Sequence, residues 1–287
     1  ENHVNFSCEA SVGGGIPILM PLHQSLAANQ IESIVGILNG TTNYILSQMT
    51  ETGVNYANAL ADAQKQGFAE ADPTNDVCGF DAARKLAILS SIGFRANVTF
   101  DDVLVEGIEK IDKSDIQYAK DMGYTIKLLT VALRQENGIA LNVYPAFLPD
   151  NHPLSSVKGA YNAIYVTGNI VDDVMFYGRG AGALPTASAV MGDVISTAQH
   201  ILNGSTGTGM IMTDTKRIPF YSSLKLQNSY YFRLDVDDVT GVLSQIAAAF
   251  AENDISICEV VQKRKTKGLA ELVLITELAS LASILPD

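Results

Sequence analysis

The feature that most constrains the fold is a series of four strand-like runs in the middle of the chain. They cover residues 124–133, 139–147, 163–167 and 173–177. Another strand is predicted at 31–38, and helix-like segments lie on both sides of the series. Because strands and helices do not alternate strictly, the pattern predicts an α+β fold around a mixed sheet instead of a doubly wound α/β fold.

Local signals predict the other elements of this region. Residues 4–11 alternate between apolar and polar side chains, which predicts a half-buried strand. Helices are expected over residues 41–49, 55–67, 76–92, 114–123 and 186–202. We expect Thr41 and Thr42 to cap the first of these helices, and Ser114 with Gln117 to form a capping box at the fourth.

The last part of the chain has a different pattern. Strands are predicted at 230–236, 255–262 and 269–276, with a helix at 243–252. This β-α-β-β order within about 50 residues is half of a ferredoxin-like unit. The predicted organisation is therefore a mixed-sheet domain at 1–177, a glycine loop, helix and linker at 178–228, and a small, incomplete ferredoxin-like domain at 229–287.

The chain is acidic, with a formal net charge of −12 and a pI near 4.7. Such a surface repels phosphate backbones and anionic lipid, so neither nucleic acid nor a membrane is expected as a partner. The three cysteines contain no CxxC pair and the four histidines are never spaced i,i+4, so neither a disulfide framework nor a zinc site is expected. The absence of a signal-peptide pattern and of any apolar run of ~18 residues predicts a cytoplasmic protein.

The most informative segment is the apolar helix expected at 76–92, because it carries an ion pair. Asp81 and Lys85 are spaced i,i+4, so their side chains meet on one face of the helix. Desolvating such a pair is expensive and only partly offset by the attraction between the charges. The pair is therefore either a structural feature of the helix or a functional centre.

Three further carboxylates stand just upstream, at Glu70, Asp72 and Asp76. Asp76 also has a structural role available, since a carboxylate in the first turn favours the helix dipole. Four carboxylates around one lysine can bind a substrate ammonium and leave the lysine as a proton donor. The surroundings therefore favour the functional interpretation of the pair.

Two glycine-rich loops are open to two interpretations each. Gly178, Gly180 and Gly182 precede a helix, where they either let the backbone approach a ligand or form a packing turn. Their spacing is not the dinucleotide-binding G-x-G-x-x-G pattern. The triplet at 13–15 either exposes backbone groups to a small cation or allows a sharp turn.

The segment from Gly67 to Lys85, GFAEADPTNDVCGFDAARK, resembles the homoserine dehydrogenase family. It contains the family's Asp-Pro, the following Asp-hydrophobic-x-Gly-x-Asp, and the lysine four residues on. Three other stretches are similar to the same family: EASVGGGIP at 9–17, NGTTNYIL at 39–46 and GAGALPTAS at 180–188. The resemblance spans residues 1 to about 202, and residues 229–285 resemble an ACT domain, a small regulatory module.

The resemblance implies NAD(P)-linked interconversion of L-aspartate 4-semialdehyde and L-homoserine, in the synthesis of threonine, methionine and isoleucine. Lys85 matches the family's proton donor to the carbonyl oxygen. A buried ammonium beside that oxygen stabilises the charge that hydride transfer leaves on it. The resemblance assigns the substrate contacts to Glu70, Asp81, Asp76, Gly40 and Thr41.

The resemblance also implies where cofactors bind. The nicotinamide of NADP or NAD is expected near Gly67, Gly180 and Gly182. A sodium site is expected at the Glu9 side chain and the carbonyls of Val12, Gly14 and Ile16. A hard cation held by oxygen ligands is consistent with that set.

The chain departs from the family in lacking the Rossmann domain of roughly 100–130 residues that precedes these motifs. We therefore expect that the polypeptide does not turn over by itself, and that part of the apolar face of the 186–202 helix is uncovered. In the ACT-like part a second helix begins at 280–285 and is stopped by Pro286, and the last strand of the usual plan is missing. It is expected either to bind L-threonine near the turn 238–241 or merely to support assembly.

Other interpretations remain open. The chain can instead be an amino-acid-sensing binding protein without a cofactor, which binds threonine through its ACT-like part. A lyase that forms a Schiff base on Lys85 ranks last, because the motif matches a different chemistry. Self-association as a homodimer or tetramer is expected, with a two-fold dimer as the default.

Overall fold

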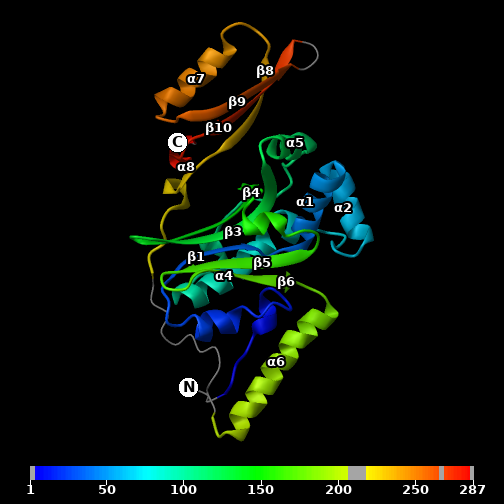
Figure 1. Cartoon of the computed structure of the whole chain (residues 1–287), viewed down its shortest axis with the longest axis vertical. Helices are drawn as coiled ribbons and strands as arrows, with labels where there is room; N and C mark the ends of the chain where they lie inside the picture. Colours follow the sequence, from blue (N-terminus) through cyan, green and yellow to red (C-terminus); the bar gives the residue numbers. More distant parts are fainter. Residues whose placement is uncertain (1–3, 206–217, 265–267, 285–287) are drawn as a thin grey trace. The chain divides into compact units, whose positions relative to one another are not determined.

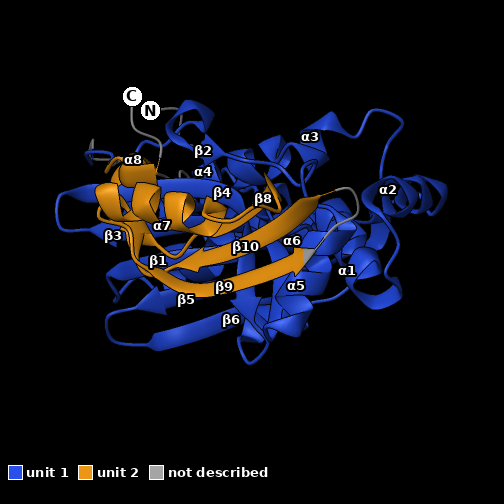
Figure 2. Ribbon diagram, turned by 90° about the horizontal axis from the view of Figure 1, so that it is seen from above, with its two compact units in different colours: residues 1–220 blue, residues 221–287 orange. Residues whose placement is uncertain are grey.

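The computed structural model describes residues 4–205, 218–264 and 268–284. The chain divides into two compact units, Glu1–Phe220 and Tyr221–Asp287, which Figure 2 colours separately. The division falls inside the region 178–228, where the sequence predicts a loop, a helix and a linker.

Unit 1 is built on a six-stranded sheet with the order β2-β4-β3-β1-β5-β6 (Figure 1). Its strands are β1 (Ile31–Ile37), β2 (Leu104–Val105), β3 (Tyr124–Gln135), β4 (Gly138–Pro149), β5 (Tyr161–Gly168) and β6 (Asp172–Arg179). β2 and β4 pair in parallel, and all other neighbours pair antiparallel. The predicted mixed sheet and its four consecutive strands are therefore confirmed.

The helices of unit 1 lie mainly on one face of this sheet. They are α1 (Gly40–Thr52), α2 (Tyr56–Lys65), α3 (Thr74–Val77), α4 (Phe80–Phe94), α5 (Lys113–Asp121) and α6 (Ala183–Leu202), with short turns η1 (Glu9–Ser11), η2 (Pro21–Ser25), η3 (Phe100–Asp102) and η4 (Pro153–Ser156). α1 to α5 all contribute buried side chains to the main apolar cluster. A smaller cluster around Ile37, Leu129 and Leu154 covers part of the other face. Burial of these side chains is the main contribution to the stability of the unit.

The strand predicted at 4–11 is wrong. Glu9–Ser11 is a 3-10 turn, and Val4 and Phe6 are exposed. The buried Glu9 carboxylate accepts hydrogen bonds from three backbone N–H groups, those of Ile18, Leu19 and Met20. These bonds fold the segment back on the start of the next helical turn, so its alternation does not correspond to a strand.

Two of the predicted helix caps are also wrong, although the helices exist. Asn39 caps α1, because its side chain accepts the N–H of Thr42 at 2.9 Å. Asp112 and Asp115 form the capping box of α5, two residues earlier than the predicted Ser114 and Gln117. In both helices the residue just before the first turn supplies the acceptor for its free N–H groups.

The helix predicted at 76–92 is broken into α3 and α4 by Gly79. This glycine has φ +82°, and a Cβ on it would lie 3.1 Å from both Val105 and Val143 side chains. Close packing against the sheet therefore requires a left-handed glycine here. Cys78 consequently lies outside α4, which begins at Phe80.

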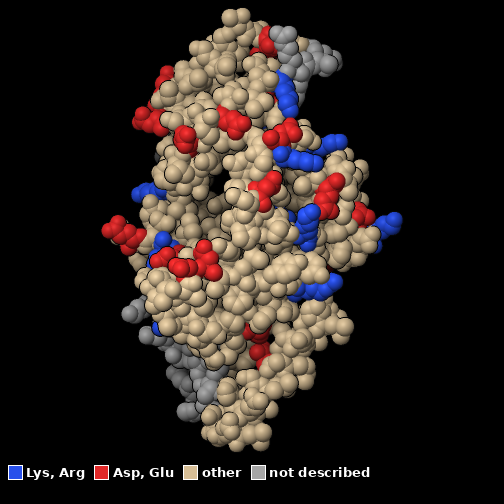
Figure 3. Space-filling model, in the orientation of Figure 1, with Lys and Arg blue, Asp and Glu red and all other residues tan. Residues whose placement is uncertain are grey.

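α6 carries an uncovered apolar face, as expected. None of its residues is buried within the described part of the chain, and Leu184, Ile195 and Leu202 are 83%, 55% and 85% exposed. Figure 3 shows that its surface carries almost no charge. No helix among the described residues is long and apolar enough to span a bilayer.

Unit 2 contains the predicted succession of strand, helix, strand and strand. Its elements are η5 (Ser223–Lys225), β7 (Gln227–Asn228), β8 (Tyr231–Asp237), α7 (Val242–Glu252), β9 (Ile257–Arg264), β10 (Leu269–Thr276), β11 (Ala279–Ser280) and α8 (Leu281–Ile284). The three long strands form an antiparallel sheet in the order β8-β10-β9. Phe232 and Phe250 make an edge-to-face contact with ring centroids 5.2 Å apart, which fixes α7 on this sheet.

Candidate active site

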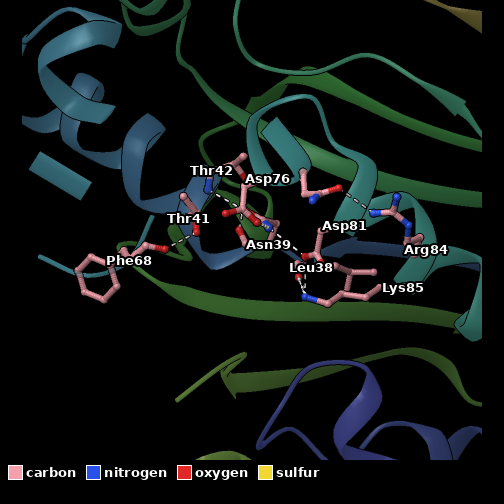
Figure 4. Close-up of polar contacts among 10 residues, drawn as sticks. Leu38, Asn39, Thr41, Thr42, Phe68, Asp76, Asp81, Arg84 and Lys85 are labelled. Carbon is pink, nitrogen blue, oxygen red and sulfur yellow. Dashed lines mark hydrogen bonds and ion pairs between the residues drawn. The ribbon is translucent and has the colours of Figure 1, made fainter. Parts of the chain in front are cut away.

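The candidate site forms where β1 runs into α1. Leu38 and Asn39 connect the two elements, and Figure 4 shows that the side chains of Asp76, Asp81 and Lys85 point toward this connection. Asp81 and Lys85 come from α4, which packs on β1. The site therefore lies on the helix-covered face of the sheet, at one end of β1.

Lys85 is held by one charged and one neutral oxygen. Its Nζ donates to Asp81 Oδ2 at 2.7 Å and to the Leu38 carbonyl at 3.1 Å. The side chains of Lys85 and Asp81 are 21% and 31% exposed, so the pair is partly open to solvent instead of buried. The predicted i,i+4 pair is confirmed, and its position leaves the ammonium accessible to a small ligand.

Asn39 connects the pair to a second carboxylate. Its Nδ2 donates to Asp76 Oδ1 at 2.7 Å and to Asp81 Oδ2 at 2.9 Å, while its Oδ1 caps α1. Asp81 Oδ2 therefore accepts from both Lys85 and Asn39. Hydrogen bonds to charged groups are the stronger class, so this arrangement fixes the carboxylate firmly.

The four carboxylates predicted around Lys85 are not all gathered there. Asp81 contacts the lysine and Asp76 is linked to it through Asn39. Glu70 is exposed, and its carboxylate has no partner among residues 4–205, 218–264 and 268–284. Asp72 is also exposed and accepts hydrogen bonds from the hydroxyl and N–H of Thr74, which lower the pKa of Asp72.

Thr41 joins α1 to the loop that carries Glu70. Its hydroxyl donates to the Phe68 carbonyl at 2.6 Å. Gly40 has its Cα against the Ala160 carbonyl, which would lie 3.0 Å from a Cβ at this position. The two predicted residues of the substrate loop therefore lie at the first turn of α1, next to Asn39.

The glycines predicted near the nicotinamide fall into two places. Gly67 has φ +76° and nothing within 4 Å of a Cβ, so it lies on an open turn. Gly180 and Gly182 form the turn between β6 and α6, and Gly182 has φ +115°. A Cβ on Gly180 would lie 2.1 Å from Asn162 Nδ2, so the backbone of this turn packs directly on that carboxamide.

Glu9, predicted as a cation ligand, has its carboxylate held by backbone hydrogen bonds. Glu9 is 6% exposed, and its carboxylate accepts from the N–H groups of Ile18, Leu19 and Met20 at 2.5 to 2.8 Å. Gly14 lies against the Gly180 turn and has φ +54°. Among the described residues no group of three or more His, Cys, Asp or Glu side chains is arranged so that it could hold a metal ion.

Sequence reasoning missed Leu38 and Asn39 as parts of the site. A carbonyl acceptor has no signal in the sequence, because any residue can supply it. Asn39 did have a signal, because an Asn just before a helix is a preferred N-cap. Arg84, the remaining charge of α4, lies away from the site and donates to Asn75 Oδ1.

The comparisons of this chain with a family model and with known proteins agree on one family. The family model described as homoserine dehydrogenase matches residues 17–195. A homoserine dehydrogenase from Mycobacterium tuberculosis is 45% identical over 292 aligned positions, which include gaps and cover 98% of this chain and 66% of that protein. The Bacillus subtilis homoserine dehydrogenase is 42% identical over 279 residues, or 96% of this chain and 64% of that protein.

Solved structures agree with these sequences. The crystal structure of a homoserine dehydrogenase from Thiobacillus denitrificans has a TM-score of 0.90 at 38% identity, covering 96% of this chain and 64% of that one. A hyperthermophilic archaeal homoserine dehydrogenase mutant in complex with NADPH has a TM-score of 0.57 at 28% identity, covering 67% and 55%. The chain thus spans slightly less than two thirds of the length of the relatives it matches. The matched motifs, the extent of the family model and the shared fold together show that this chain belongs to the homoserine dehydrogenase family.

Proposed function

We propose that this chain carries the catalytic centre for reversible, NAD(P)-dependent reduction of L-aspartate 4-semialdehyde to L-homoserine. The observation that carries the proposal is the Lys85 ammonium, fixed by Asp81 and the Leu38 carbonyl at the end of β1. The family motifs surround this group in sequence, and the structure brings Asp76, Asp81 and Lys85 to one place.

The proposed chemistry needs a proton at the oxygen that receives negative charge. A bound nicotinamide cofactor supplies hydride to the aldehyde carbon. Lys85 Nζ donates a proton to the carbonyl oxygen in this direction, and accepts the hydroxyl proton of homoserine in the reverse direction. Asp81 keeps the ammonium oriented, because its Oδ2 is itself held by Asn39.

The remaining predicted substrate residues would surround the amino-acid end of the ligand. Gly40 and Thr41 present the first turn of α1, whose N-terminus favours a carboxylate. Asp76 supports the site through Asn39, and Glu70 has an exposed carboxylate that is free to meet the substrate ammonium. Binding at several points fixes the carbonyl relative to Lys85, which is a large part of catalysis in such reactions.

We propose that the nicotinamide lies near the turn of Gly180 and Gly182 and near Gly67. A relative of the same family has been solved in complex with NADPH, which supports a nicotinamide cofactor for this chain. NADP and NAD are both compatible with these residues. The amino-acid-sensor interpretation is not favoured by the comparisons, all of which name dehydrogenases.

We propose a sodium site at Glu9 and the carbonyls of Val12, Gly14 and Ile16. In the described part of the chain these three carbonyls accept no backbone hydrogen bond, so no backbone N–H group competes with a cation for them. A melting temperature higher in NaCl than in choline chloride of equal ionic strength, and equal in both salts for Glu9→Gln, would support the site.

We propose self-association through the edge of the sheet at β6, as a homodimer or a tetramer. Met175 and Tyr177 are 41% and 54% exposed there, and Tyr177 stacks on Tyr161 at 5.2 Å.

For unit 2 we propose an ACT-like role with L-threonine as effector at the turn 238–241. Light scattering tests the first proposal, and calorimetry with threonine tests the second.

The deciding experiment is an assay of homoserine oxidation by the product of the complete reading frame, beside the 287-residue chain. We expect nicotinamide reduction by the longer protein and none by the chain alone. A longer protein that is folded and inactive with both NAD and NADP would refute the proposed function. Turnover by the 287 residues alone would instead place nucleotide binding within this chain.

A further inference from the structure

Asn162 is a buried polar side chain without a complete set of partners. It is 1% exposed, and its Oδ1 has no hydrogen-bond partner among the described residues. A buried carboxamide oxygen without a donor destabilises a fold, so nearly all such atoms are paired in folded proteins. An unpaired one inside a well-packed unit points to a partner that is absent from the chain itself.

The sheet register brings Asn162 next to the candidate site. Ile37 of β1 pairs with Ala163 of β5, so continuing the antiparallel register by one residue brings Leu38 beside Asn162. Leu38 supplies the carbonyl that holds Lys85. On its other side Asn162 pairs with Gly178 of β6, two residues before the Gly180 turn.

The side chain of Asn162 lies on the same face of the sheet as Lys85. Residues alternate between the two faces of a strand, so Asn162 shares its face with Ile164 and Val166. Both of these belong to the main apolar cluster, to which α4 contributes. The carboxamide is therefore on the helix-covered side, at the end of the sheet where β1 leads into Asn39 and α1.

Two glycines leave room for this carboxamide. A Cβ on Gly180 would lie 2.1 Å from Asn162 Nδ2 and 2.6 Å from Oδ1, and a Cβ on Gly40 would lie 3.5 Å from Oδ1. The side chain thus sits between the first turn of α1 and the turn between β6 and α6. These are the loops assigned above to the substrate and to the nicotinamide.

We propose that Asn162 is a ligand-binding residue of this site, whose Oδ1 accepts a hydrogen bond from a ligand N–H group. The inference rests on the proposed function and adds one residue to it. Two N–H donors fit this chemistry, the ammonium of the amino-acid substrate and the carboxamide of the nicotinamide. Kinetic measurements with each ligand varied in turn distinguish them.

The test is Asn162→Leu in the full-length protein, because leucine has a similar volume and no polar atom. Removing an unpaired buried amide leaves the unfolding midpoint unchanged or raises it. We expect the KM of the ligand that Asn162 contacts to rise at least about tenfold, the size expected for a lost hydrogen bond to a polar ligand group. A rise for homoserine identifies the substrate ammonium, and a rise for NADP identifies the nicotinamide.

Asn142→Leu is the matched control. Asn142 on β4 is 2% exposed and its Nδ2 also lacks a partner in the described chain, but it lies on the opposite face of the sheet, since Leu141 and Val143 belong to the main cluster. We expect a similar change of stability and unchanged KM values. If Asn162→Leu does not fold, Asn162→Ala removes the same group without new bulk.

The inference is overturned if both KM values of the folded Asn162 variant equal those of the wild type. That result is distinct from failure of the proposed function, which appears as an inactive wild-type protein. A rise of KM in Asn142→Leu equal to that in Asn162→Leu would also overturn the inference, because the effect would then follow from any lost buried amide.

Discussion

Two lysines of unit 1 occupy opposite kinds of surroundings, although both are tied to the start of α1. Lys85 donates to a carboxylate, Asp81, and to the Leu38 carbonyl, and its side chain is 21% exposed. Lys127 on β3 donates to Asn43 Oδ1 and to the Val157 carbonyl, and the residue is 2% exposed. One ammonium is charge-paired and open, whereas the other is enclosed by neutral oxygens.

The difference in partners and exposure determines which of the two lysines can exchange a proton with a ligand. Burial lowers the pKa of Lys127 to about 8, and no carboxylate lies within ion-pair distance of it in the described chain. Its partner Asn43 also donates to the carbonyls of Val157, Gly159 and Tyr161. Lys127 therefore joins β3, α1 and the loop before β5, which is a structural role, while Lys85 is left for chemistry.

The largest effect is expected from Lys85→Met in the full-length protein. Loss of the proton donor should reduce homoserine oxidation by about 10²–10⁴-fold, the range for general acid–base groups, with a small change in the free energy of unfolding. Arg84→Met is the control, because Arg84 is the neighbouring cation of α4 and donates to Asn75 instead. If Lys85→Met and Arg84→Met lost equal activity, the loss would not be specific to the Lys85 ammonium, and the proposed contrast between Lys85 and Lys127 would fail.

The second effect is on stability and concerns Lys127. Its folded pKa of about 8 lies below the ordinary 10.5, so between these values the unfolded chain binds more protons and stability rises with pH. The gain across that window is about 3 kcal/mol, from about 1.4 kcal/mol for each unit of pKa. Lys127→Met removes this gain, and the comparison of this variant with the wild type isolates it.

Denaturant unfolding at pH 7.5 and pH 10.5 measures this pH-dependent part of the free energy of unfolding. We expect the stability of the wild type relative to Lys127→Met to increase by about 3 kcal/mol between the two pH values. The exposed Lys120→Met is the control and should show no such change. A difference independent of pH would mean that Lys127 is no more buried in solution than Lys120, and the comparison with Lys85 would fail.

The contact of Lys85 with Asp81 could be predicted from the sequence, whereas the contacts of Lys127 could not. The spacing of Asp81 and Lys85 on a helix requires only local geometry, so their contact could be predicted. Lys127 stands in the middle of the apolar strand β3, and its partners Asn43 and Val157 are 84 and 30 residues away. Contacts over such distances depend on the sheet order, which the local pattern does not contain.

The same limit explains the other errors. The four central strands and most helices follow from local periodicity, and they were predicted. Glu70 and Asp72 lie close to Lys85 in sequence but on a loop whose course depends on the Thr41–Phe68 contact and on the break at Gly79. Glu9 is held by N–H groups nine to eleven residues later, which turns an apparent strand into a turn.

The smallest effect is expected at Asn39, whose side chain links the Lys85–Asp81 ion pair to Asp76. Asn39→Ser keeps an N-cap acceptor for α1, because serine caps helices about as well as asparagine, but it removes the donor to Asp76 and Asp81. We expect kcat/KM to fall about fivefold, which corresponds to one hydrogen bond of about 1 kcal/mol, with little change in stability.

Asn55→Ser provides the matched control, since Asn55 caps α2 through the N–H of Asn58 and is exposed. It should change stability as little as Asn39→Ser does and leave kcat/KM unaltered. If Asn39→Ser also keeps full activity, Lys85 alone orients Asp81, and Asp76 is uncoupled from the centre. Lys85 would then differ from Lys127 only in its exposure and in having a charged partner.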